Sequence, residues 1–242
     1  MARCVLVTGA SQGIGRATAE VLSRSGAEVV GIARSAPAEA FPGSFYAADL
    51  GDRDATAEVM ARIVGDHAVD GLVNNLGLNI VERLGEVTLD SFDRVMDLNL
   101  RTAIQVTQAV LPGMRARGYG RIVNVSSRGA LGREGRTSYG AAKAGLIGMS
   151  RTWALELAGD GITVNVVSPG PTATEMFRRN NLSGPDAAVR ERAFLADVPM
   201  NRFGTPEEIA FGVAMFLDPR ASFITGQVLH VCGGSTIGAA PL

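Results

Sequence analysis

The stretch Thr8-Gly9-Ala10-Ser11-Gln12-Gly13-Ile14-Gly15 decides the fold, because it joins a strand-like segment to a helical one. Residues 3–8 before it are apolar and β-branched, residues 14–25 have helical periodicity, and residues 28–33 are again strand-like, which predicts a βαβ unit. The small residues let the backbone approach a pyrophosphate at a helix N-terminus, so we predict a phosphate-binding turn. The alternative is a tight turn whose glycines adopt positive φ without a ligand.

Short apolar segments continue to alternate with helical ones along the rest of the chain. Strands are predicted at 45–48, 71–73, 121–125, 162–167 and 227–231, and helices at 52–65, 89–117, 139–158 and 206–217, the last capped by Thr205 with Pro206 in its first turn. This pattern predicts an α/β fold, a Rossmann-type doubly wound parallel sheet of about seven strands with helices on both faces. We expect a single domain over residues 1–242, with an irregular segment at 169–200 that predicts a substrate lid around 171–202.

Composition restricts the class of protein. Of 242 residues, 46% are hydrophobic and 19% charged, which favours a large buried core over disorder. A net charge of −1 gives no electrostatic footprint for nucleic acid or an anionic membrane, and no apolar run approaches the length of a membrane span. With no N-terminal targeting signal, we expect a cytoplasmic protein without nucleic-acid or membrane partners.

The cysteines and histidines do not predict a metal site or a hydrolase. Cys4 and Cys232 lack the paired spacing of zinc ligands or a disulfide framework, and we expect both to be buried packing residues. Neither His67 nor His230 lies near a Ser or Cys in the sequence in a way that suggests a hydrolase.

The T-G-x-x-x-G-x-G turn resembles that of the short-chain dehydrogenase/reductase family, and Asn74-Asn75-Leu76-Gly77 resembles the N-N-A-G segment of that family. The matching motifs occur in family order over residues 8–234. The resemblance implies a nicotinamide cofactor contacted at the turn and at this second segment by Thr8, Gly9, Ser11, Gln12, Gly13, Ile14, Gly15, Asn75 and Gly77.

The end of the second strand indicates which nicotinamide cofactor is bound. No acidic side chain occurs in residues 29–35 to accept hydrogen bonds from an NAD ribose. Arg34 stands where similar enzymes pair a guanidinium with the 2′-phosphate of NADP, so NADP(H) is favoured over NAD(H). The alternative for Arg34 is a solvated charge at a strand end. Asp49 resembles the family's adenine-contacting aspartate, with Leu50 beside it.

Tyr139 and Lys143 are four residues apart in Ser138-Tyr139-Gly140-Ala141-Ala142-Lys143, which places both on one face of a helix. Free tyrosine has a pKa near 10, and we expect the nearby ammonium to lower it towards working pH. The pair resembles the family's catalytic Tyr and Lys, and Lys143 would also reach the nicotinamide ribose. Ser127 resembles the serine that binds the substrate oxygen, with Ser126 as the second choice, and Asn99 resembles the asparagine of the family's water relay.

The segment after the sixth predicted strand resembles the family's P-G-x-x-x-T contact to the nicotinamide carboxamide. Its candidate cofactor residues are Pro169, Gly170, Thr172 and Thr174. Proline and glycine there are also ordinary loop residues.

The leading hypothesis is an NADPH-dependent carbonyl reductase that resembles 3-oxoacyl-thioester reductases. The alternative enzyme is a sugar or secondary-alcohol dehydrogenase, since the same residues work in both directions. A non-enzymatic alternative is a cofactor-binding sensor or structural subunit that has lost turnover. Asp160 is acidic where carrier-dependent members present basic residues, which disfavours a carrier-bound substrate. Arginines 128, 133 and 136 near the catalytic residues are interpreted as solvated charges, with an anionic substrate as the alternative. The resemblance also implies a homotetramer joined through helices around 100–117 and 139–158.

Overall fold

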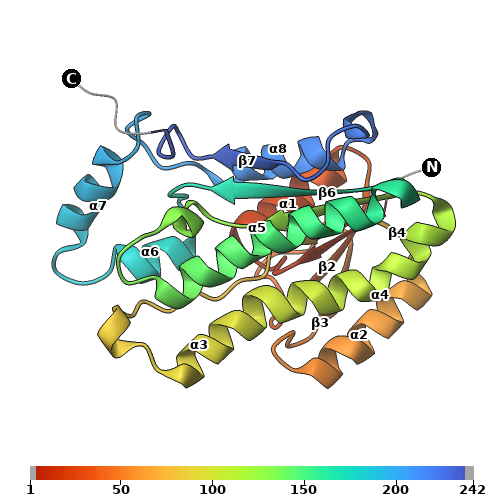
Figure 1. Ribbon diagram of the computed structural model, residues 1–242, viewed down its shortest axis with the longest axis horizontal. Coiled ribbons are helices and arrows are strands. Elements are labelled where there is room, and N and C mark those ends of the chain that lie inside the picture. Colours follow the sequence, from red (N-terminus) through yellow and green to blue (C-terminus); the bar gives the residue numbers. More distant parts are fainter. Residues whose placement is uncertain (1–3, 238–242) are drawn as a thin grey trace.

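A single parallel sheet runs through the computed structural model, which describes residues 4–237 (Figure 1). Its strand order is β3-β2-β1-β4-β5-β6-β7, with every neighbouring pair parallel. The strands of this described part are β1 (Cys4–Thr8), β2 (Glu28–Ala33), β3 (Ser44–Ala47), β4 (Val69–Asn74), β5 (Gly120–Val125), β6 (Ile162–Pro169) and β7 (Val228–Val231). The predicted α/β fold is confirmed, and Arg3 of the first predicted strand lies outside the described residues.

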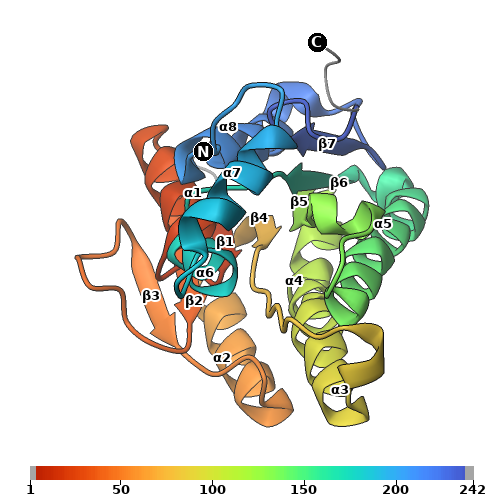
Figure 2. The same ribbon diagram turned by 90° about the vertical axis from the view of Figure 1, so that its left-hand side faces the viewer.

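Helices cover both faces of the sheet, as the view in Figure 2 shows. One face packs against α1 (Gly13–Arg24) and α8 (Pro206–Leu217), whose Leu22, Ile209, Val213 and Phe216 contribute to one core cluster. The other face packs against α2 (Arg53–Asp66), α4 (Thr102–Arg117) and α5 (Thr137–Leu157), whose apolar residues contribute to the second cluster. The central strands are apolar on both faces because each face is buried under helices.

Local sequence signals account for several helix ends. Thr205 caps α8: its Oγ1 accepts from the Glu208 backbone N at 3.3 Å, and the Glu208 carboxylate accepts from the Thr205 N at 2.8 Å. Asp52 caps α2 with its side chain alone, which accepts hydrogen bonds from the N–H groups of residues 54 and 55. The predicted cap at Thr205 is therefore confirmed.

Two segments differ from the sequence prediction. The helical stretch 89–117 is divided into α3 (Leu89–Met96), a π-helical turn η2 (Asp97–Arg101) and α4, which lets Asn99 turn into the protein interior. The segment predicted as irregular contains two helices, α6 (Glu175–Asn181) and α7 (Ala187–Ala196), at the end of the molecule beside the start of α5 (Figure 1). The sequence does not predict these two helices because few of their residues are buried, so they show no clear apolar periodicity.

The remaining short helices are single 3₁₀ turns: η1 (Leu84–Glu86), η3 (Arg128–Leu131), η4 (Ala158–Asp160) and η5 (Pro219–Ala221). Among the described helices, none has the length and apolarity required to span a bilayer. Cys4 and Cys232 are both buried and unpaired, as predicted.

Candidate active site

A cleft of about 830 Å³ opens at the carboxyl ends of the strands. It lies where the strand order reverses, between β1 and β4, which is the position where open α/β sheets bind ligands. The structure brings most of the sequence-predicted site residues together in its lining: Gly9, Ser11, Gln12, Gly13, Ile14, Arg34, Asp49, Leu50, Asn75, Gly77, Ser127, Tyr139, Lys143, Pro169, Gly170, Thr172 and Thr174. Thr8, Gly15 and Asn99 are not among the lining residues.

The glycine-containing turn forms one end of the cleft. Gly9 and Gly13 have φ of 65° and 56°, a backbone region that favours glycine. Helix α1 begins at Gly13, and its N-cap residue Gln12 makes no side-chain cap and is followed by no acidic residue in the first turn. The first N–H groups of α1 are thus left for an anion, which fits a dinucleotide phosphate.

Thr8 and Gly15 shape this turn from behind. The Thr8 Oγ1 accepts hydrogen bonds from the backbone N of Asn75 at 3.0 Å and of Leu76 at 3.1 Å, so it joins the ends of β1 and β4. The Asn75 Nδ2 donates to the carbonyls of Thr8 and Gly9. A Cβ on Gly15 would lie 2.3 Å from the Gly9 carbonyl oxygen, so only glycine fits there.

Arg34, Asp49 and Leu50 lie at the end of the cleft nearest β2 and β3. Arg34 is exposed and makes no ion pair with another described residue. Asp49 accepts from the Gly51 N at 2.9 Å, while Leu50 is buried. The end of β2 therefore offers an unpaired guanidinium, which suits a phosphate, rather than an acid.

Tyr139 and Lys143 lie one turn apart on α5, with the Lys143 Nζ 5.8 Å from the centroid of the Tyr139 ring. Lys143 is the only lysine in the chain. It is 3% exposed, its Nζ donates to the Val125 carbonyl at 2.9 Å, and burial lowers its pKa to about 8.

The pKa of Tyr139 differs from the sequence expectation. Burial raises the pKa of the phenol, and the hydrogen bond with Ser127 and the charge of Arg136 only partly offset this effect. The prediction that the Lys143 ammonium lowers it is therefore wrong for the protein alone. The phenol is protonated at neutral pH and can act as an acid.

The structure distinguishes the two candidate serines. Ser126 is buried and its Oγ donates to the Lys143 backbone carbonyl at 2.8 Å, so it ties β5 to α5. Ser127 lines the cleft, accepts from the Gly129 N at 3.0 Å and hydrogen-bonds with Tyr139. Only Ser127 places its hydroxyl beside the phenol.

Asn99 lies behind Lys143 in the π-helical turn. Its Nδ2 donates to the carbonyls of Leu78 at 2.9 Å and Val95 at 2.8 Å, while its buried Oδ1 has no hydrogen-bond partner among the described residues. A Cβ on Gly77 would lie 2.9 Å from this Oδ1 and 3.2 Å from the Lys143 Nζ. The Asn99 Oδ1, the Cα of Gly77 and the Lys143 Nζ therefore lie around one small space.

The segment after β6 closes the cleft near the glycine turn. The Gly170 N donates to the Val231 carbonyl at 2.9 Å, and the Thr172 Oγ1 donates to the Gly170 carbonyl at 3.0 Å. Thr174 caps α6 and lies against Gly13, since a Cβ there would be 3.3 Å from its methyl group.

Sequence reasoning missed most of the substrate end of the cleft. Its apolar lining includes Leu78, Met176, Phe177 and Phe194, and the rings of Phe177 and Phe194 lie 5.0 Å apart. Leu78 is more than 90 positions away from the other three residues in the sequence, and no motif marks any of the four.

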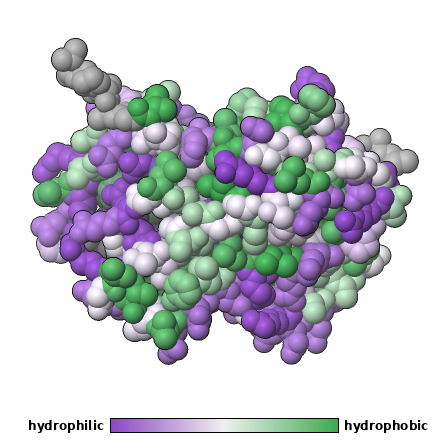
Figure 3. Space-filling model, viewed as in Figure 1, coloured by the Kyte–Doolittle hydropathy of each residue, from purple (hydrophilic) through white to green (hydrophobic). Residues whose placement is uncertain are grey.

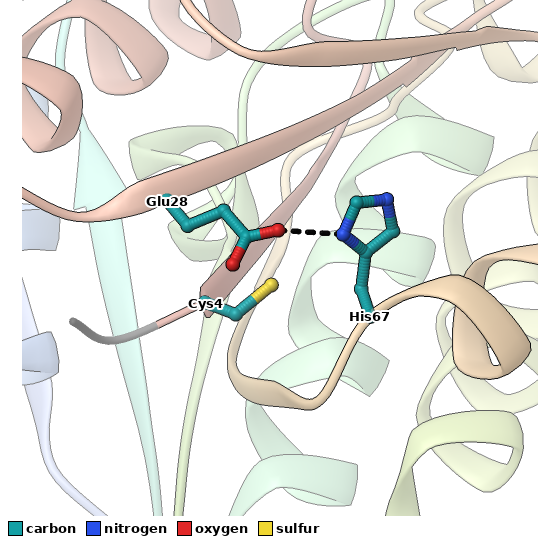
Figure 4. Close-up of side chains that lie close together, drawn as sticks. All are labelled: Cys4, Glu28 and His67. Carbon is teal, nitrogen blue, oxygen red and sulfur yellow. Dashed lines mark hydrogen bonds and ion pairs between the residues drawn. The ribbon is translucent and has the colours of Figure 1, made fainter. Parts of the chain in front are cut away.

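A second cluster of chemically active side chains lies at the amino ends of the strands, around Cys4, Glu28 and His67 (Figure 4). Their ligand atoms lie within 4.8 Å of one another, a proximity that their positions in the sequence do not indicate. The His67 Nδ1 pairs with Glu28 at 2.6 Å and its Nε2 with the Tyr46 hydroxyl at 3.1 Å. Burial raises the pKa of Cys4 to about 12, so the thiol is neutral and a poor nucleophile.

Comparisons with known proteins match nearly the whole chain. A family model described as Enoyl-(Acyl carrier protein) reductase matches residues 9–236. The 3-oxoacyl-(acyl-carrier-protein) reductase FabG of Thermotoga maritima is 40% identical over 244 residues, with 96% of this chain and 97% of the relative covered.

Two solved structures are also similar to this chain over nearly its whole length. One is described as a short chain dehydrogenase/reductase family protein, with 36% identity, a TM-score of 0.86 and 97% of both chains covered. The other, a putative NAD(P) dependent gluconate 5-dehydrogenase from Beutenbergia cavernae with bound NADP, has 31% identity and a TM-score of 0.90, with 98% of this chain and 97% of that chain covered.

Proposed function

Because the chain belongs to the short-chain dehydrogenase/reductase family and is an NAD(P)-dependent oxidoreductase, we propose that it reduces a ketone of the 3-oxoacyl type to a secondary alcohol with NADPH. The observation that carries the proposal is one cleft that holds Ser127, Tyr139 and Lys143 at one end and the glycine turn and Arg34 at the other. We also propose that residues 1–242 act as one domain.

The residues present fit a dinucleotide. The uncapped start of α1 at Gln12 and Gly13 would hold its phosphates, Asp49 and Leu50 its adenine, and Asn75, Lys143 and Thr174 its nicotinamide half. The bound cofactor would supply the hydride. Arg34 favours NADP because its guanidinium suits the 2′-phosphate, and a structural relative is described with bound NADP.

Tyr139 would donate the proton to the substrate oxygen. Its hydroxyl is protonated at neutral pH because burial raises its pKa, and the developing alkoxide is a stronger base than a phenolate. Ser127 would donate a second hydrogen bond to the same oxygen and hold it beside the phenol. Lys143 and the Oδ1 of Asn99 lie on the inner side, where they would return a proton to Tyr139.

A dehydrogenase of sugar acids is the second candidate function. The same residues serve the reverse reaction, and one structural relative is described as a gluconate 5-dehydrogenase. The cleft lining also includes Asn79, whose buried Oδ1 has no hydrogen-bond partner among the described residues and could accept from a substrate hydroxyl group. Oxidation of gluconate with NADP⁺, faster than reduction of any ketone with NADPH, would favour this candidate.

We propose that the segment 171–202 is a lid over the substrate end. Met176 and Phe177 in α6 and Phe194 in α7 line the cleft, so displacement of this segment would open the substrate end to solvent. The segment contacts the residues before α5 at two points: Asn181 hydrogen-bonds with Arg136, and the Phe194 ring packs against Arg133.

We also propose a homotetramer that uses the faces of α4 and α5. Figure 3 shows hydrophobic residues along the middle of this face, and Ile104 and Leu155 are 37% and 85% exposed. A further exposed apolar group, Phe211 and Met215, lies on α8. Light scattering is expected to give four times the chain mass, and a monomer would contradict the assembly.

The test of the proposed function is oxidation of NADPH by ketones and 3-oxoacyl thioesters with wild type and Tyr139→Phe. The variant is expected to lose at least about 100-fold in kcat, as for removal of a general acid. Tyr119→Phe is the matched control, because Tyr119 stacks under Arg121 and does not line the cleft. NADPH binding without turnover of any ketone or alcohol would instead support the sensor alternative.

A further inference from the structure

Three arginines, Arg128, Arg133 and Arg136, line the cleft that holds Tyr139, and each contacts a neutral partner. Nη2 of Arg136 donates to Oδ1 of Asn181 at 2.7 Å. The guanidinium of Arg133 lies 3.8 Å from the centroid of the Phe194 ring. Nε of Arg128 donates to the Ser235 carbonyl at 3.1 Å. The side chains are therefore positioned without any neutralisation of their charge.

None of these three arginines forms an ion pair with a carboxylate in residues 4–237. Glu134, the acid nearest in sequence, pairs with Arg83 instead. The whole cleft lining holds seven cationic side chains but only two acidic ones, Asp49 and Glu175. The cleft is thus strongly positive although the chain as a whole carries a net charge of −1.

Burial of these positive charges without a counter-ion among the described residues lowers the stability of the ligand-free protein. Arg136 is 7% exposed, so the sequence interpretation of a solvated charge is wrong for it. The pKa values of Arg133 and Arg136 are lowered, first by burial and then by the charge of the neighbouring arginine. Asp197 acts in the opposite direction on Arg133 but lies beyond ion-pair distance. A bound anion would offset the cost.

The cofactor does not account for this anion site. Its phosphates fit the start of α1 and Arg34, at the other end of the cleft. Arg136 immediately precedes α5, and its charge acts on Tyr139 directly. The anion must therefore belong to the molecule whose oxygen faces Tyr139.

We propose that the substrate is a small oxo acid, or the matching hydroxy acid, whose carboxylate is bound by Arg128, Arg133 and Arg136 while its ketone oxygen faces Ser127 and Tyr139. The inference rests on the proposed function and specifies its substrate class. Planar guanidinium groups bind a carboxylate through two parallel hydrogen bonds, which fixes the position of the attached carbon chain. A singly charged carboxylate also suits the flanking rings of Phe177 and Phe194 better than a doubly charged phosphate, because less charge must be desolvated.

The charge in this proposal lies a few bonds from the ketone. A carrier-bound or coenzyme-bound thioester has no charge at that distance, since its phosphate is separated from the carbonyl by a long chain. The arginines thus discriminate between small acids and thioesters within one reaction class.

The experiment compares pyruvate, acetoacetate and levulinate with their methyl esters and with the N-acetylcysteamine thioester of acetoacetate. Calorimetric titration of each compound into the protein with NADP⁺ measures binding apart from turnover, and NADPH oxidation measures kcat/KM. At least one acid is expected to bind at least about tenfold more tightly than its ester, with the same preference in kcat/KM. That preference is expected to fall to near one in Arg133→Gln and in Arg128→Gln.

Arg192→Gln is the matched control, because Arg192 lies on α7 of the same segment but is exposed and outside the cleft lining. It is expected to retain the preference for the acid. Esters that bind as tightly as every acid, or a preference that persists in both cleft variants, would overturn the inference. If an acid binds and the preference follows the arginines but NADPH reduces none of the compounds, the proposed reduction fails while the anion site stands.

Discussion

Nη2 of Arg136 donates a hydrogen bond to Oδ1 of Asn181 at 2.7 Å, and so joins the residue before α5 to the last residue of α6. The two residues are 45 positions apart in the chain. Arg136 is the N-cap residue of the catalytic helix, and Asn181 belongs to the segment that we propose as a lid. This hydrogen bond links the start of α5 directly to the end of α6, and so fixes the position of segment 171–202 relative to the arginine-lined end of the cleft.

Removal of this bond is expected to loosen the segment. In Asn181→Ala, proteolytic cleavage within 171–202 should become roughly tenfold faster, since a hydrogen bond to a charged group contributes about 1.5–3 kcal/mol. Limited proteolysis of the native protein with mass spectrometry measures the rate. Arg192→Ala, on the exposed side of α7, should leave cleavage unchanged. Equal rates for wild type and Asn181→Ala would show that the bond does not hold the segment.

Arg34 is expected to decide the choice of dinucleotide. Titration should show NADPH binding more tightly than NADH, and Arg34→Ala should weaken NADPH binding by tenfold to hundredfold, about 1.5–3 kcal/mol, with little effect on NADH. The preference should also fall with added salt because the side chain is exposed. Arg151→Ala, an exposed change outside the cleft, serves as the control. Tighter binding of NADH by wild type would favour the dehydrogenase alternative.

The single lysine of the chain allows a direct test of its pKa. Selective ¹⁵N or ¹³C labelling of lysine gives one side-chain resonance, which should titrate with a midpoint near 8 in the free protein. A midpoint at the ordinary value of 10.5 would mean that water reaches Nζ despite its burial.

The same pKa shift predicts a pH dependence of stability. Below pH 8, Lys143 is protonated in both the folded and the unfolded protein, and the folded protein bears the free-energy cost of burying the ammonium. Between about pH 8 and 10.5, Lys143 is protonated only in the unfolded protein. The free energy of unfolding therefore rises with pH over this range. Lys143→Met should therefore be more stable than wild type at pH 7 by about 1–2 kcal/mol, after loss of the bond to Val125. Chemical denaturation should show this difference shrinking as the pH rises towards 10.5, and a constant difference would contradict the account.

Gly15 is expected to be irreplaceable in the cofactor turn. An alanine Cβ would lie 2.3 Å from the Gly9 carbonyl oxygen and 2.5 Å from the Asn75 Nδ2, so Gly15→Ala should displace the turn. We expect a loss of about 2 kcal/mol or more in stability and weaker NADPH binding, measured by denaturation and titration. Gly65→Ala in α2 is the control, since no atom lies within 4 Å of its Cβ position, and it should stabilise the protein by about 0.5–1 kcal/mol.

Several features of the site were predictable because they are local. The glycine turn lies between a strand and a helix that are adjacent in the sequence, and the spacing of Tyr139 and Lys143 puts both on one helical face at any position in the fold. The resemblance to a known family then indicated Ser127, which the structure places beside Tyr139, and Asn99, which it places beside Lys143.

Other features depended on contacts between distant segments. The predicted cofactor residues Thr8 and Gly15 lie behind the turn rather than in the cleft lining, because one bonds to Asn75 across the sheet and the other packs against Gly9. The proximity of Cys4 and His67 follows from the pairing of β1 with both β2 and β4.

The sequence by itself determined the alternation of strands and helices, the glycine turn and the catalytic pair, since each depends on periodicity or on neighbours within a few residues. Only the tertiary structure decided that Tyr139 has a raised pKa and that Arg136 is buried with no ion-pair partner among residues 4–237. Both properties depend on burial and on charges contributed by remote segments, and electrostatic free energies are set by the surrounding protein and its exclusion of water rather than by residue type.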